Sequence, residues 1–121
     1  MNLVKSLFFK PKLSREAFEA YFHRLPDNIE VKWFRDRNFI VGEVTAGENK
    51  FVTQGKDADD LIEMVNDAVI TVNSIPKEYI EAIRQYKTYK PPLEEELKLR
   101  NPNIRGAVIS VRKNEKILEL A

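Results

Sequence analysis

The sequence predicts an α+β fold in which a three-stranded antiparallel meander is packed by one helix. Residues 29–34, 39–44 and 50–54 are short runs of strand-forming residues, and the polar loops between them are short enough for hairpins. An amphipathic stretch over residues 58–73 follows directly, with apolar residues at helical spacing. We therefore expect this helix to cover one face of the meander.

The first strand has the clearest strand pattern. Ile29, Val31 and Trp33 share one parity, and Glu30 and Lys32 share the other. Successive side chains of a strand point to opposite faces of a sheet, so this alternation is typical of a half-buried strand. We expect the apolar side to face the core.

The helix over residues 58–73 has a clear start and a clear stop. Asp57 occupies the N-cap position and Asp60 follows three residues later, which is an acidic variant of the capping box. The β-branched run 69–72 favours a strand by propensity alone. We assign it to the helix because the helical spacing continues through it and Pro76 then stops the element.

Further elements are predicted on both sides of this unit. Ser14 is placed to cap a helix over residues 14–25, whose aromatic stripe we interpret as core packing. Residues 104–112 and 116–120 are expected to form a C-terminal hairpin. We predict a single domain over residues 1–121, with a core at about 29–73 and a C-terminal arm at about 91–121.

Composition restricts the class of protein. The chain has 121 residues and a net charge of +1, so no whole-molecule field attracts nucleic acid or anionic lipid. It has no cysteine, which suits a reducing compartment, and no apolar run long enough to span a membrane. We expect a cytoplasmic protein with no membrane association.

The sequence contains no convincing catalytic or metal-binding set. Glu30, Asp36, Glu43 and Asp57 are the carboxylates near the meander, and solvated strand faces explain them. His23 is the only histidine and cannot make a histidine-rich metal site by itself. We predict that the protein is not an enzyme and uses no metal or cofactor.

The best candidate for a binding patch is the end of the first hairpin. Lys32, Arg35 and Arg37 lie beside Trp33 and Phe34, and cations next to aromatic rings can hold phosphates and stack unpaired bases. We prefer to interpret this region as a charged hairpin tip with Trp33 in the core. The same tip, or the edge of the meander, can instead contact a protein partner.

The junction between the third strand and the helix carries a family resemblance. Val52, Thr53, Gln54, Gly55 and Asp57 form a strand, a glycine and an N-cap, and the helix that follows is rich in acidic residues. Over residues 29–73 the chain resembles the HicB-like antitoxin family, whose domain is a truncated ribonuclease-H-like unit. Gly55 can supply a positive φ angle or a close backbone approach at this turn. Four further residues of the helix match the family pattern: Asp60, Leu61, Asp67 and Ala68.

The resemblance implies a non-catalytic protein that binds a small ribonuclease toxin and neutralises it by direct contact. It also implies a homo-oligomer, either a dimer or a tetramer. Residues 93–121 offer one charged helix followed by strands, which does not match the DNA-binding regions of the family, so we do not expect operator binding. The alternative function is single-stranded nucleic-acid binding, or a structural oligomer, on the same scaffold.

Overall fold

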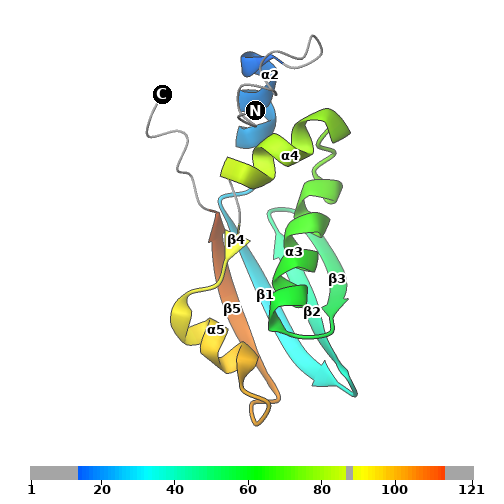
Figure 1. Cartoon of the computed structure of the whole chain (residues 1–121), viewed down its shortest axis with the longest axis vertical. Coiled ribbons are helices and arrows are strands. Elements are labelled where there is room, and N and C mark those ends of the chain that lie inside the picture. Colours follow the sequence, from blue (N-terminus) through cyan, green and yellow to red (C-terminus); the bar gives the residue numbers. More distant parts are fainter. Residues whose placement is uncertain (1–13, 87–88, 114–121) are drawn as a thin grey trace, which may run out of the picture.

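The fold is built on one antiparallel sheet, which a computed structural model describes together with its helices for residues 14–86 and 89–113. The strand order is β3-β2-β1-β5-β4, and every neighbouring pair is antiparallel (Figure 1). The predicted α+β class is confirmed. The elements are α2 (Arg15–Arg24), β1 (Asn28–Asp36), β2 (Phe39–Ala46), β3 (Asn49–Gly55), α3 (Ala58–Val72), α4 (Lys77–Tyr86), β4 (Tyr89–Lys90), α5 (Leu93–Arg100) and β5 (Gly106–Lys113).

Strands β1, β2 and β3 form the predicted meander through two tight hairpins. The first hairpin closes at the pair Asp36 and Phe39, and the second closes at Ala46 and Asn49. Gly47 follows Ala46 with a φ of 62°, which a glycine adopts without steric cost. Each hairpin therefore joins neighbouring strands with two intervening residues, as the short polar loops indicated.

Helix α3 packs on one face of the meander, also as predicted. Its side chains Leu61, Val65 and Val69 are buried against the sheet, and Figure 1 shows α3 running back over β2 and β3. The β-branched residues 69–72 are helical, and α3 ends at Val72. Packing of the apolar face thus outweighs the strand propensity of this run.

The alternation along β1 gives the sheet two different faces. Ile29, Val31 and Trp33 are buried beneath the helices, whereas Glu30 and Lys32 are exposed on the other side. Trp33 is only 1% exposed and is among the largest fully buried side chains. The sequence prediction for the orientation of this strand is confirmed.

Helices α2 and α4 pack together beside one end of the sheet (Figure 1). The Ser14 side chain caps α2 by accepting a hydrogen bond from the Ala17 N–H at 3.0 Å. The rings of Tyr21 and Tyr79 lie 5.0 Å apart between the two helices. Phe22 in α2 is fully buried, so the predicted core role of the aromatic stripe is confirmed.

The C-terminal strand joins the main sheet. Residues 106–112 of β5 pair with β1, so this strand extends the meander on the side away from β2. Arg112 has Asn28 opposite it on one side and Lys90 on the other, so both edges of the strand are occupied there. The second strand of the predicted hairpin lies outside the described residues.

Candidate functional site

One face of the sheet, opposite α3, carries exposed side chains of mixed chemistry, and we call it the open face. Strand register places its side chains in three rows across β3, β2, β1 and β5. None of the helices in the described ranges buries it, because its positions alternate with the buried ones along each strand. The rows are Gln54, Val41, Phe34 and Gly106; Val52, Glu43, Lys32 and Val108; and Lys50, Thr45, Glu30 and Ser110.

The open face carries apolar side chains that are well exposed. Val52 is 68% exposed, Val108 is 51% exposed and Phe34 is 40% exposed. Val52 and Val108 lie at the two ends of one row, with Glu43 and Lys32 between them, so apolar and charged side chains are interspersed on this face.

The charges of the open face balance. Lys32 lies directly opposite Glu43 on the neighbouring strand, and Lys50 and Glu30 occupy the next row. The two lysines and two glutamates leave these three rows without net charge. These four side chains border a hollow of about 360 Å³ on the face.

Arg35 has a structural role that the sequence did not indicate. Its Nε donates to the Ile104 carbonyl at 2.8 Å, and its Nη2 donates to the carbonyls of Leu99 at 2.6 Å and Asn101 at 2.9 Å. The guanidinium carbon also lies 5.2 Å from the centre of the Trp33 ring, within cation–π range. The side chain therefore holds the C-terminal end of α5, where unpaired carbonyls favour a cation.

The three cations of the predicted patch do not converge. Lys32 projects onto the open face, Arg35 turns toward α5, and Arg37 occupies the exposed hairpin turn with a φ of 60°. Adjacent positions in a strand point to opposite faces, so proximity in sequence did not bring these side chains together. The role of Lys32, Arg35 and Arg37 in binding a partner or RNA stays a prediction.

The residues of the predicted family signature form the junction between β3 and α3. A Cβ on Gly55 would lie 2.3 Å from the Leu61 nitrogen, so the close backbone approach, and not a positive φ, requires glycine here. Asp57 accepts a hydrogen bond from the Asp60 N–H at 2.8 Å, and the Asp60 carboxylate accepts one from the Lys56 N–H at 2.8 Å. The expected N-cap by Asp57 is present, whereas the return bond of Asp60 goes to the residue before the cap and not to Asp57 itself.

The two remaining signature residues of β3 lie on opposite faces. Gln54 is exposed on the open face opposite Val41, and Thr53 lies half-buried on the α3 side opposite Gly42. The signature is thus mainly architectural, because most of its residues shape the strand-to-helix turn.

A buried asparagine that sequence reasoning missed fixes β4. Asn66 in α3 donates from Nδ2 to the Tyr89 carbonyl at 3.0 Å and accepts from the Tyr89 N–H at 2.8 Å, so its amide imitates a neighbouring strand. The signal available in the sequence was a lone amide on the inward side of an apolar helix.

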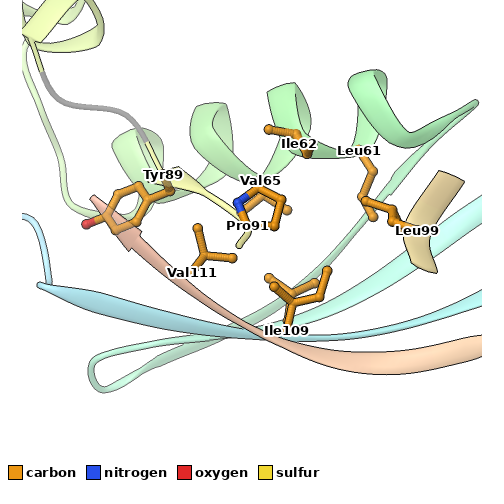
Figure 2. Close-up of a pocket in the computed structure, with 9 residues that line it drawn as sticks. Leu61, Ile62, Val65, Tyr89, Pro91, Leu99, Ile109 and Val111 are labelled. Carbon is orange, nitrogen blue, oxygen red and sulfur yellow. The ribbon is translucent and has the colours of Figure 1, made fainter. Parts of the chain in front are cut away.

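An apolar gap lies beside this contact, between α3, α5 and the sheet (Figure 2). Its volume is about 20 Å³, and its walls carry almost no polar surface, so it is a packing gap and not a ligand site. Figure 2 shows side chains of α3, α5 and β5 around the gap, with Tyr89 at one end and its ring directed away from the others. It is lined by Val31, Leu61, Ile62, Val65, Tyr89, Pro91, Leu99, Ile109 and Val111.

An ion-pair cluster attaches α5 to the first turn of α3. The Arg100 guanidinium contacts the carboxylates of Asp59 and Glu96, the latter at 3.1 Å. The hydrogen bond and charge of Arg100 lower the pKa of Asp59 below its usual value. This cluster is exposed and structural.

Within residues 14–86 and 89–113, no three His, Asp or Glu side chains are grouped closely enough to hold a metal ion. His23 lies exposed in the last turn of α2, with its ring against Phe22. In the same described ranges, no helix combines the length and apolarity needed to cross a bilayer.

Comparison of the chain with protein-family models, with curated proteins and with solved structures finds no significant match. The HicB-like relationship therefore stays a prediction from the residues of the β3–α3 junction.

Proposed function

We propose that this protein is a non-catalytic, antitoxin-like binding module that neutralises a small ribonuclease toxin by direct contact through its open face. The observation that carries the proposal is the composition of that face. Exposed apolar side chains (Val52, Val108 and Phe34) lie among two lysines and two glutamates on an antiparallel sheet. Mixed surfaces of this kind, with apolar residues among balanced polar ones, are typical of non-obligate protein interfaces.

The balance of charge favours a protein partner over nucleic acid. Binding to a phosphate backbone depends on a local excess of Lys and Arg, and the two lysines of the open face lie among two glutamates. Arg35 donates three hydrogen bonds to backbone carbonyls of the C-terminal region. The nucleic-acid alternative thus has less support than the protein-binding one.

The antitoxin part of the proposal depends on the resemblance of residues 29–73 to the HicB-like family. The meander, the close approach at Gly55 and the Asp57 cap agree with what that resemblance implies for the fold. The identity of the partner as a ribonuclease comes from the resemblance alone.

The first experiment is a tagged pull-down of the full chain from the native host's lysate, with and without ribonuclease treatment. We expect a small basic protein to co-purify in near-equal amount and to survive the ribonuclease. Expression of its gene should then arrest growth, and co-expression of this chain should relieve the arrest. Partners that disappear on ribonuclease treatment would instead favour the nucleic-acid alternative.

Two open-face variants test whether this face binds the toxin. Phe34→Glu and Val108→Lys should each abolish the relief of toxicity, because they place charges within the apolar part of the contact. Leu97→Glu is the matched control, since Leu97 is 58% exposed but lies on α5, away from the open face. Equal loss of protection by all three variants, or by none of them, would contradict binding through the open face.

A further inference from the structure

Strand β3 forms one outer edge of the sheet, and no strand in the described part of the chain lies beyond it. Alternate N–H and C=O groups along such an edge lack sheet partners and can pair with another strand. Natural edges are usually protected by prolines, bulges or several charges. β3 carries Lys50 as its single charge and has no proline, and Val52 at its centre is 68% exposed.

The flank of α3 above this edge is also apolar and unoccupied within the described residues. Met64, Ala68 and Val72 follow one another at four-residue spacing and so lie in one row along the helix. Met64 is 38% and Val72 is 37% exposed. The opposite flank faces α5 and β4, through the contacts of Asp59 with Arg100 and of Asn66 with Tyr89, so this row lies on the β3 side.

The centre of the exposed β3 edge and the centre of the apolar row on α3 lie at the same level along the sheet. Gly55 packs against the backbone of Leu61, where the strand passes into the helix. Val52 lies three residues before Gly55, about 10 Å back along the strand. Ala68 lies seven residues after Leu61, also about 10 Å along the helix. Because α3 packs back along β3, Val52 and Ala68 are at the same level along the two elements, with Val52 on the face of the sheet opposite α3.

We propose that two copies of the chain form a symmetric dimer in which the β3 edges pair antiparallel and the α3 flanks pack together. The two-fold axis passes between the two copies of Val52 and then between the two copies of Ala68. This arrangement continues the sheet across both subunits and covers the apolar row on each helix. It does not depend on the antitoxin function proposed above.

The charges that flank β3 favour this register over the one centred a residue later. With Val52 opposite the Val52 of the partner subunit, Glu48 lies opposite the Lys56 of the partner subunit, and this attraction occurs twice by symmetry. Lys50 then lies opposite a glutamine. A two-fold axis one residue later, at Thr53, would place Lys50 opposite the Lys56 of the partner subunit and cause repulsion twice.

The helices fit the same symmetry. Neighbouring strands are about 4.8 Å apart, and α3 lies over β3 and β2, so the two copies of α3 are separated by roughly two strand spacings. A separation of about 8–10 Å is the normal distance for packed helices. The small Ala68 at the axis permits close approach, and Met64 meets the Val72 of the partner subunit.

Charge reversal provides the decisive test. The full chain is expected to sediment as a dimer, and Glu48→Lys and Lys56→Glu should each weaken dimerisation roughly tenfold. The double variant should restore it, because the attraction returns with its sign exchanged. Glu78→Lys, at an exposed site on α4, is the matched control and should have no effect. A wild-type monomer, or a double variant no better than the single ones, would overturn the proposal.

Disulfide cross-linking tests the contact between the two β3 edges directly. The chain has no cysteine, so Val52→Cys introduces one thiol per subunit. Opposed residues of antiparallel strands have Cα atoms about 4.5–5.5 Å apart, which a disulfide can span. Mild oxidation should link the Val52→Cys subunits, whereas Val108→Cys, equally well placed for solvent on β5, should remain unlinked. Equal linking of both variants would contradict the proposed interface.

Discussion

The guanidinium group of Arg35 donates a hydrogen bond to the Leu99 carbonyl oxygen at 2.6 Å, and this bond ties β1 to the last turn of α5. Leu99 itself is buried and anchors α5 against the sheet. A cation in the first hairpin thus positions a helix that begins more than fifty residues later in the chain. The same contact turns the Arg35 side chain away from Lys32, which lies on the open face.

Replacement of Arg35 by alanine should destabilise the protein by about 2–3 kcal/mol, because partly buried carbonyls of the α5 end lose a charged donor. Arg35→Lys should recover little of this loss, since one ammonium cannot reproduce the planar fork of a guanidinium. Urea unfolding measures both. Arg37→Ala, at the exposed turn, is the control and should change the free energy of unfolding by less than about 0.5 kcal/mol.

Gly55→Ala should be among the most damaging single substitutions. Its Cβ would lie 2.3 Å from the Leu61 nitrogen, so the backbone of β3 or α3 must move, at a cost of about 3 kcal/mol or more. Gly47→Ala is the comparison, because the nearest atom to its Cβ is 3.8 Å away and only the positive φ opposes it. That strain is about 1–2 kcal/mol. Thermal unfolding should rank the two variants in this order, and the reverse order would contradict the role assigned to Gly55.

Asn66→Leu should release β4 without unfolding the meander. The substitution leaves the buried N–H and C=O of Tyr89 without their side-chain partner, at a cost of about 2–3 kcal/mol. Hydrogen exchange at the Tyr89 amide should accelerate strongly, while exchange in β2 should follow only the global loss of stability. Unchanged protection at Tyr89 would show that Asn66 does not hold this strand.

The ion pair between Asp59 and Arg100 should make part of the stability depend on pH. Arg100 lowers the pKa of Asp59 in the folded protein, so folding is favoured above the unfolded pKa of Asp59 and this contribution is lost as the pH falls through the folded value. Asp59→Asn should therefore be less stable than the wild type at neutral pH, and the difference should shrink below about pH 4. Urea midpoints at several pH values measure it, with a smaller difference expected at high salt.

Local sequence signals determined the meander, the two capped helices over residues 14–25 and 58–73, and the inward side of β1. These features depend on contacts between residues close in the chain: two-residue hairpins, the Asp57 cap, and the period of apolar positions. The spacing of residue types along the chain is enough to identify such features. The need for glycine at position 55 could also be anticipated, although the reason for it required the structure.

The tertiary structure alone decided the pairing of β5 with β1, the commitment of Arg35 to α5 and the neutral composition of the open face. Each depends on residues far apart in sequence, and a strand's period identifies its two faces without naming its neighbours. The sequence by itself determined which side chains β1 turns inward. Only the assembled sheet decided that Lys32 lies between Glu43 and Val108, because that row exists only after three separate segments have paired.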